Sequence, residues 1–138
     1  MADTVDTVII GGGVVGLACA RALAQAGEEV WLLEAAPALG QGISSRSSEV
    51  IHAGLYYPEN SLKAALCCRG RELLYEFCAA RGVGHQRLGK LIVAQGEGRA
   101  SELEALKARG DALGVPGLTL LTEADLRQKA PALLGTAA

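Results

Sequence analysis

The amino-acid sequence predicts an α/β fold that opens with a strand, a helix and a second, parallel strand. Three observations carry this prediction. An apolar, β-branched run reaches Ile10, a glycine-rich turn follows at 11–16, and a second apolar run ends at Glu34. Buried parallel strands are near-continuous apolar runs of this kind, and strand, turn, helix and strand within about 30 residues make one βαβ unit.

The residues between the two runs predict a helix over 14–26, because they are rich in Ala and Leu. Gly27 is expected to end this helix as its C-terminal cap. Before the helix, Gly11, Gly13 and Gly16 match the spacing GxGxxG. In that pattern the first glycine permits a tight turn, the second lets a pyrophosphate approach the backbone, and the third lets the helix pack on the strand.

Glu34 lies at the end of the second predicted strand, 18 residues after Gly16. A carboxylate at this place can accept hydrogen bonds from both ribose hydroxyls of an adenosine, and it would repel a 2′-phosphate. The first amides and the dipole of the preceding helix favour an anion. The sequence therefore predicts a site for the ADP half of a dinucleotide. FAD and NAD share that half, so the motif alone leaves both open.

The composition excludes several classes of protein. The chain has 138 residues, a formal net charge of -2, 50% hydrophobic residues and 20% charged residues. So little net charge is unsuited to a wide polyanion, and no nucleic-acid partner is expected. So much apolar side chain excludes a disordered tail. The cysteines form no CxxC pair, which predicts reduced thiols and no metal site; they are Cys19, Cys67, Cys68 and Cys78.

An apolar stretch at 7–20 resembles a signal peptide or a membrane span at first sight. It is too short to cross a bilayer, which takes about 20 residues. Asp3 and Asp6 stand where a signal peptide carries basic residues. We therefore expect a soluble, cytoplasmic protein without a transmembrane segment. Peripheral membrane contact stays an open alternative.

The segment after Glu34 departs from a simple NAD-binding domain, which would continue with another helix and a third parallel strand. Here a loop with four serines around Arg46 leads into a short apolar piece. Serine hydroxyls and backbone amides are good partners for anions. A solvated, serine-rich linker is the alternative when this segment is taken alone.

The remaining sequence predicts a helix over 61–81, with Ser61 as its N-cap and Gly82 as its stop. Its apolar residues recur near helical spacing and predict one buried face; they are Leu62, Leu66, Leu73, Phe77 and Ala80.

Two strands and two more helical segments are expected after that helix. The strands are predicted at 87–94 and 118–121, and a helix is predicted at 96–114. Thr122 is the expected cap of a last helical turn, with Asp125 in the capping-box position.

The stretch SSRSSEVIHAGLYYPENSLKAALCCRG, at 44–70, resembles the FAD-dependent oxidoreductases of the D-amino-acid-oxidase superfamily, and within it the L-2-hydroxyglutarate oxidase/dehydrogenase group. The resemblance extends from about residue 7 to about residue 131. It implies a Rossmann-like FAD-binding domain of the glutathione-reductase-like type, of which 1–84 would be the N-terminal part. It also implies that 85–138 begin a mixed α+β substrate-binding domain.

The resemblance implies FAD contacts for twelve residues. These residues fall into four groups: those of the turn that faces the pyrophosphate, those that meet the adenosine ribose, those beside the pyrophosphate and ribityl chain, and those that offer backbone atoms along the flavin. In that order the residues are Gly11, Gly13, Val14, Val15 and Gly16; Glu34 and Ala35; Ser44 and Ser45; and Glu49, Val50 and Ile51.

His52 is implied to lie near the isoalloxazine ring. An imidazole there can bind a substrate carboxylate or help to remove a hydroxyl proton, or it can be a packing residue. The implied reaction is hydride transfer from a small 2-hydroxy acid, with L-2-hydroxyglutarate as the first candidate, to the flavin and then to oxygen or a quinone. An amine or amino-acid oxidase, a glycerol-3-phosphate dehydrogenase-like enzyme, a nicotinamide-binding module and a non-catalytic dinucleotide-binding fragment stay open.

In the resembling enzymes, the third parallel strand and the C-terminal flavin-contacting segment come after the point that corresponds to residue 138. The sequence is therefore expected to be the N-terminal portion of a larger flavoenzyme. By itself it would leave an apolar sheet face and edge uncovered. We expect these residues alone to bind FAD weakly and to turn nothing over.

Overall fold

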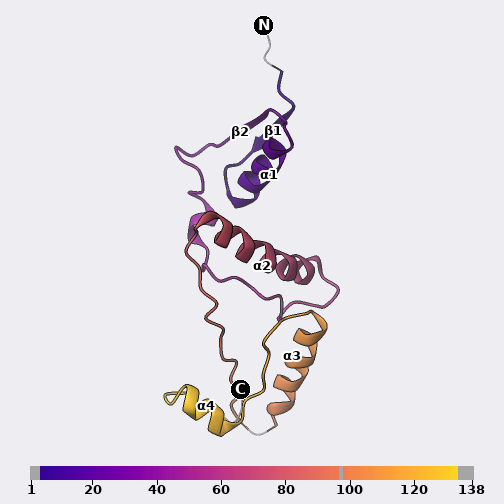
Figure 1. The fold of residues 1–138 in the computed structure, drawn as a ribbon, viewed down its shortest axis with the longest axis vertical. Helices are drawn as coiled ribbons and strands as arrows, with labels where there is room; N and C mark the ends of the chain where they lie inside the picture. The colour runs from indigo at the N-terminus through magenta and orange to yellow at the C-terminus, as the bar shows by residue number, and fades with distance from the viewer. Residues whose placement is uncertain (1–3, 97, 134–138) are drawn as a thin grey trace. The chain divides into compact units, whose positions relative to one another are not determined.

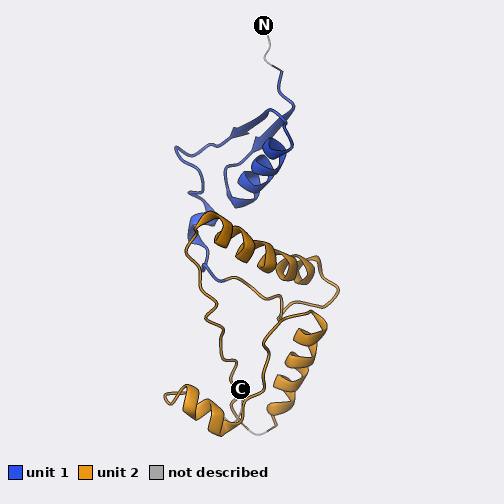
Figure 2. Ribbon diagram, viewed as in Figure 1, with its two compact units in different colours: residues 1–50 blue, residues 51–138 orange. Residues whose placement is uncertain are grey.

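A computed structural model describes residues 4–96 and 98–133, which fall into two compact units, 1–50 and 51–138 (Figure 2). The ends of the two predicted domains, 1–3 and 134–138, lie outside the described residues. The predicted division at 84/85 concerns cofactor and substrate roles, and it stays a prediction. None of the described helices combines the length and the apolar character that crossing a membrane requires.

Unit 1 is a βαβ arrangement made of β1 (Thr7–Ile10), α1 (Val14–Gln25) and β2 (Val30–Leu33) (Figure 1). The two strands pair in parallel, with Thr7 opposite Val30 and Ile10 opposite Leu33. The predicted α/β class and the parallel strands are thus confirmed. The strands are shorter than the apolar runs that predicted them, because only the residues opposite a partner join the ladder.

A glycine lies at each end of α1 and sets where the helix begins and ends. Gly13 precedes the helix in an extended conformation, with φ −76° and ψ 179°. At the other end Gly27 adopts φ +91°, and the Glu28 amide donates to the Leu23 carbonyl at 3.2 Å. Because a left-handed residue turns the chain away from the helix axis, the predicted stop at Gly27 is confirmed.

One face of the β1–β2 pair is covered by α1, and the other is open. A Cβ at Gly16 of α1 would lie 2.0 Å from the Gly11 carbonyl oxygen and 3.4 Å from Ile9 Cγ2, so helix and strand are in close contact. Apolar side chains on the opposite face stay exposed, with Ile10 at 87%. The uncovered apolar face expected from the sequence is therefore present in unit 1.

Unit 2 contains α2 (Leu62–Arg81), α3 (Ala100–Ala112) and α4 (Glu123–Lys129). Ser61 Oγ accepts a hydrogen bond from the Ala64 amide at 3.1 Å, and Gly82 ends α2 with φ +65°. Thr122 and Asp125 cap α4 reciprocally, each accepting from the other's backbone amide. These three predicted helix boundaries are confirmed because each depends on hydrogen bonds between residues close in sequence.

The prediction for the buried face of α2 was wrong. Leu62 is 79% exposed and Leu66 is 66% exposed, whereas the buried residues of the helix are Ala64 and Cys78. A loop packs on the Ala64 side: a Cβ at Gly54 would lie 2.9 Å from Cys68 Sγ and 3.1 Å from the Ala64 carbonyl oxygen. Spacing identifies an apolar face, but the neighbouring segments decide which face they cover.

The predicted strands at 87–94 and 118–121 were also wrong as paired strands. Both segments are without regular pairing, and within the described residues only Ala94 and Thr122 are isolated bridge positions. A cavity of about 520 Å³ is lined by parts of both segments and by Leu103 and Leu106 of α3. Strand propensity needs a partner backbone, and no described segment of unit 2 supplies one in regular register.

Replacing Gly16 with Ala is expected to destabilise unit 1 by about 1–3 kcal/mol, because the new methyl group meets a backbone oxygen that cannot move aside cheaply. Urea unfolding followed by the fluorescence of Trp31, the single tryptophan, measures this change in β2. Gly70→Ala is the control, since a Cβ there meets nothing within 4 Å in α2 of unit 2. An unchanged midpoint for Gly16→Ala would show that helix and strand are not in close contact.

Candidate dinucleotide-binding site

The site begins at the glycine turn that joins β1 to α1. Gly11 adopts φ +104°, and its amide donates to the Leu33 carbonyl at 2.8 Å. A Cβ at Gly13 would lie 3.3 Å from Ser44 Oγ. The turn therefore brings the first amides of α1 to the carboxyl edge of the parallel strands, where an anion is stabilised by the helix dipole. Gly11 has the positive φ that the predicted tight turn requires, and the pyrophosphate contact of both glycines stays a prediction.

Glu34, just after β2, is fixed against the glycine turn by two hydrogen bonds. Its Oε1 accepts from the Ala36 amide at 2.8 Å, and its Oε2 accepts from the Gly12 amide at 2.6 Å. The bond from Ala36, followed by that from Gly12, lowers the pKa of the Glu34 carboxyl below its ordinary value. An ionised carboxylate offers about four acceptor positions, so places remain for ribose hydroxyls.

Ser44 contacts the start of α1, although it lies 30 residues further along the chain than Val14. It lies in the short 3₁₀ helix η1 (Ile43–Arg46), and its Oγ accepts from the Val14 amide at 2.9 Å. Because the hydroxyl is the acceptor in this bond, its own proton remains a donor that can face an anion. The structure thus brings Val14 and Ser44 together beside Gly13, as the predicted pyrophosphate site requires.

Ser45 has a different local role from Ser44. Its hydroxyl donates to the Gln41 carbonyl at 3.0 Å and to the Gly42 carbonyl at 2.9 Å. These bonds close the turn at the start of η1, so in this conformation Ser45 holds the loop that carries Ser44. The sequence predicted the same role for both serines, but their hydrogen bonds differ: Ser44 bonds to the start of α1, and Ser45 bonds within its own loop.

Sequence reasoning missed Gly12 and Leu39. A Cβ at Gly12 would lie 2.5 Å from Leu39 Cδ2 and 3.0 Å from Glu34 Oε2, and the Gly12 carbonyl accepts from the Gly40 amide at 2.9 Å. Gly12 occupies a variable place in GxGxxG, so the motif gave it no role. The run of three consecutive glycines could have indicated that Gly12 is also crowded, because a glycine there leaves space that a side chain would fill.

The other predicted contacts are spread over both units. Val15 is exposed on α1, and Ala35 adjoins Glu34. Glu49 adopts φ +58°, which is costly for a residue with a Cβ and is characteristic of functional loops, and Val50 is exposed beside it. Ile51 begins unit 2 and is half-buried there.

His52 is exposed at the start of an anchored loop in unit 2. The Ala53 carbonyl accepts from Cys68 Sγ at 3.4 Å, Gly54 is buried with φ +89°, and Leu55 is only 5% exposed. The backbone after His52 is therefore held on α2 while the imidazole stays open to a ligand. By contrast, the Nδ1 of His85 is hydrogen-bonded at 2.8 Å to the Val83 carbonyl.

The described residues hold the features that a pyrophosphate-bearing dinucleotide needs. A Cβ would fill the space over Gly13, Glu34 is a hydrogen-bonded carboxylate, and Val14 and Ser44 lie at the start of the helix. Within the part of the chain that the structure describes, no three His, Cys, Asp or Glu side chains gather as metal ligands. The arrangement can bind and orient a nucleotide, and it fits the ADP half of FAD or NAD.

Glu34→Gln is expected to destabilise unit 1 at neutral pH, because Gln has one acceptor oxygen and its NH₂ group would face the second of the two N–H donors, Gly12 and Ala36. Since the folded pKa is lowered, the stabilisation by Glu34 is fully present above the ordinary value of 4.5 and is lost as the pH falls through the folded pKa. The gap between wild type and Glu34→Gln in the Trp31 unfolding midpoint should therefore narrow in acid. Glu76→Gln, in α2 of unit 2, is the control, and a gap that is constant with pH would contradict the assignment.

Comparison with known proteins places this chain in a family. The family model described as FAD dependent oxidoreductase (DAO) matches residues 6–138. The mitochondrial L-2-hydroxyglutarate dehydrogenase of Arabidopsis thaliana is 50% identical over 131 residues, which are 95% of this chain and 27% of that protein. The enzyme of the same name from Homo sapiens is 44% identical over 128 residues, 91% of this chain and 28% of that protein. The chain thus spans little more than a quarter of these relatives.

Solved structures agree with this placement. The dithionite-reduced L-α-glycerophosphate oxidase of Mycoplasma pneumoniae, with FAD bound, matches with a TM-score of 0.82 and 31% identity, over 99% of this chain and 37% of that one. The L-proline dehydrogenase of P. horikoshii has a TM-score of 0.80 over 99% of this chain and 36% of its own, and at 24% identity it supports the fold alone. The resemblance inferred from residues 44–70 is confirmed, and the chain belongs to the family of FAD-dependent oxidoreductases.

Proposed function

We propose that the protein that carries this sequence binds FAD through unit 1 and oxidises a small 2-hydroxy acid, with L-2-hydroxyglutarate as the substrate. One observation carries the proposal. The turn, carboxylate and serine that suit a dinucleotide lie together in a chain that is 50% identical to a protein named L-2-hydroxyglutarate dehydrogenase. A second candidate, glycerol 3-phosphate, is supported by the likeness to the L-α-glycerophosphate oxidase.

The residues of unit 1 would hold the ADP half of FAD. Gly11, Gly13 and Gly16 let the pyrophosphate come close to the backbone at the start of α1. Glu34, already bonded to the Gly12 amide, would accept from the ribose hydroxyls, and Ser44 would donate to the pyrophosphate. The further contacts in this proposal are Val14, Val15, Ala35, Ser45, Glu49, Val50 and Ile51.

Bound FAD supplies an isoalloxazine ring that accepts a hydride from the substrate carbon. Oxidation of a 2-hydroxy acid to a 2-oxo acid releases that hydride from C2 and a proton from the hydroxyl group. A neutral imidazole can take the proton, so His52 is proposed as the base. Its exposure and the anchored backbone at Gly54 and Leu55 support this role, because a base must reach the substrate and keep its position.

Oxygen or a quinone completes the proposed reaction as electron acceptor, and a quinone would bring peripheral contact with a membrane surface. The cytoplasmic location expected from the sequence belongs to the same proposal. The names of the Arabidopsis and human relatives place those proteins in mitochondria.

Gly13→Val is expected to abolish FAD retention, because the side chain would occupy the space beside Ser44 Oγ that the pyrophosphate needs. Quenching of flavin fluorescence during titration with the protein measures the affinity. Gly84→Val is the matched control, since a Cβ at Gly84 meets nothing within 4 Å. Equal affinities for wild type and Gly13→Val would refute the pyrophosphate assignment.

His52→Gln is expected to slow flavin reduction by about 10²–10⁴-fold, the usual contribution of a general base, while FAD stays bound. The measurement is anaerobic bleaching of the FAD-loaded, full-length polypeptide. L-2-hydroxyglutarate should bleach the flavin, and its D enantiomer should not. Bleaching by glycerol 3-phosphate alone would favour the second candidate, and an unchanged rate in His52→Gln would exclude His52 as the base.

A further inference from the structure

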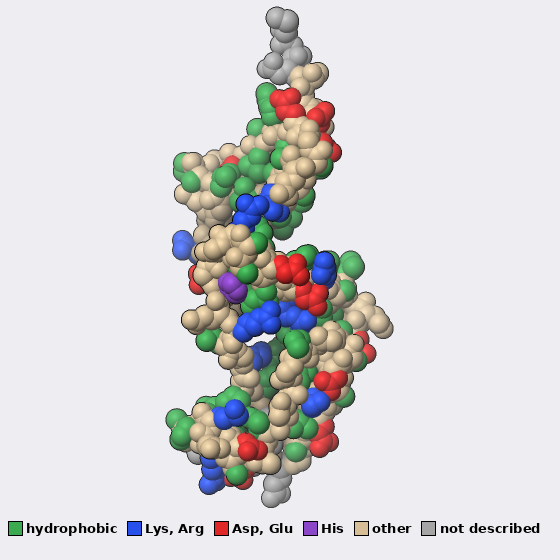
Figure 3. Space-filling view, viewed as in Figure 1, with side chains coloured by type: hydrophobic (Ala, Val, Ile, Leu, Met, Phe, Trp, Pro, Cys, Tyr) green, Lys and Arg blue, Asp and Glu red, His purple; other side chains and the backbone are tan. Residues whose placement is uncertain are grey.

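All three tyrosines of the chain carry a cationic side chain over the ring. Lys63 Nζ lies 4.3 Å from the ring centre of Tyr57, and Lys90 Nζ lies 4.3 Å from that of Tyr56. Arg87 lies 4.0 Å above Tyr75. These residues belong to unit 2, and Figure 3 shows a band of Lys and Arg side chains across that unit. Cation–π contacts at this distance are attractive, so they favour the positions in which the charges lie over the rings.

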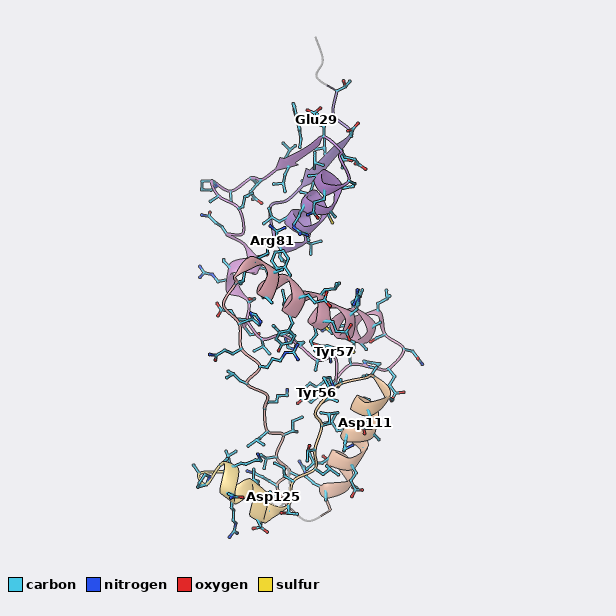
Figure 4. The ribbon with its side chains drawn as sticks, viewed as in Figure 1. Glu29, Tyr56, Tyr57, Arg81, Asp111 and Asp125 are labelled. Atoms are coloured by element: carbon cyan, nitrogen blue, oxygen red, sulfur yellow. The ribbon has the colours of Figure 1, made fainter. Side chains whose placement is uncertain are left out.

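Tyr56 and Tyr57 are held by the loop that carries them. The Tyr57 amide donates to the Gly54 carbonyl at 3.1 Å, which closes a turn. Leu55 is buried, and a Cβ at Gly110 of α3 would lie 2.7 Å from Leu55 Cδ1. The loop is thus fastened to α2 on one side and to α3 on the other, and Figure 4 shows the two tyrosines close together. Their rings are fixed supports for the two lysines.

Lys63 and Lys90 form no ion pair with a carboxylate in the part of the chain that the structure describes, a property they share with several other cations of unit 2 but combine with a contact to an aromatic ring. In the described residues, no carboxylate lies within 4.0 Å of either ammonium group. By comparison, Lys107 pairs with Asp111 at 2.6 Å. Lys63 and Lys90 therefore keep uncompensated charge in positions that are already ordered. A ligand that binds there loses less side-chain entropy than it would on freely rotating lysines.

We propose that Lys63 and Lys90, held on the rings of Tyr57 and Tyr56, bind the carboxylates of a small dicarboxylic acid. This inference rests on the proposed function, because it names the groups that recognise the two anionic ends of that substrate. Ammonium groups form charge-assisted hydrogen bonds with carboxylates, and the phenol hydroxyls add donors. His52 lies at the start of the loop that carries Tyr56 and Tyr57, and Lys63 of α2 and Lys90 of the 87–94 segment meet that loop through their contacts with its two rings.

The test is a titration of the 138-residue chain with glutarate at low ionic strength, followed by NMR signals of the tyrosine and lysine side chains. Saturable shifts are expected at Tyr56, Tyr57, Lys63 and Lys90, with an affinity at least about tenfold higher than for butyrate, which has one carboxylate. Inorganic phosphate is the third arm. Equal affinity for butyrate or phosphate would overturn recognition of a dicarboxylic acid.

Lys63→Met and Lys90→Met each should weaken glutarate binding about three- to tenfold, and the double variant should lose the saturable shift. Met keeps the apolar stem and removes the charge. Lys107→Met is the matched control, because Lys107 lines the same cavity as Lys90 but is paired with Asp111. Undiminished glutarate affinity in the double variant would overturn the proposal.

Two further measurements distinguish recognition by charge from recognition by lysine itself, and this proposal from the proposed function. Lys63→Arg with Lys90→Arg should keep glutarate affinity within about threefold, since Arg retains both the charge and the contact with the ring. Loss of binding in this folded variant as well would count against the two charges as the recognition element. FAD affinity, measured on the same samples, tests the proposed function alone: a wild-type chain that binds glutarate but no FAD would refute only the latter.

Discussion

The hydrogen bond from the Gly12 amide to Glu34 Oε2, at 2.6 Å, is the contact on which unit 1 and its site depend. It joins the end of β2 to the turn that follows β1, so the parallel strands and the candidate nucleotide site share one interaction. The same carboxylate also accepts from Ala36, which leaves it ionised and fixed in direction. In the proposed complex with FAD, a carboxylate that is oriented in advance would cost little to reorganise on meeting ribose hydroxyls.

Ser44 extends this arrangement through a contact that spans 30 residues, from Ser44 Oγ to the Val14 amide. The bond closes the loop over the glycine turn and satisfies one of the unpaired amides at the start of α1. A Cβ at Gly13 would lie 3.3 Å from that same Ser44 Oγ, so a side chain there would be crowded by the loop. The same hydrogen bond thus bonds the first amide of α1 and holds the Ser44 hydroxyl beside the glycine turn.

Both units leave large apolar side chains exposed, although their turns and helix ends are well defined. Ile10 is 87% exposed on the open face of the β1–β2 pair, and Leu88 is 85% exposed beside the cavity of unit 2. Local hydrogen bonds hold the helix ends at Ser61 and Thr122 without help from that core. The loop at Gly54 and Leu55 is different, because it depends on contacts with α2 and α3.

The sequence by itself determined the features that arise from near neighbours along the chain: the stop at Gly27, the caps at Ser61 and Thr122, and the GxGxxG turn, because backbone freedom and short-range hydrogen bonds depend on residue type. Only the tertiary structure decided the rest. The exposed Leu62 face and the unpaired 87–94 segment depend on which segments lie opposite them. The contact of Ser44 with the Val14 amide and the crowding of Gly12 by Leu39 arise between residues far apart in sequence, which spacing does not encode.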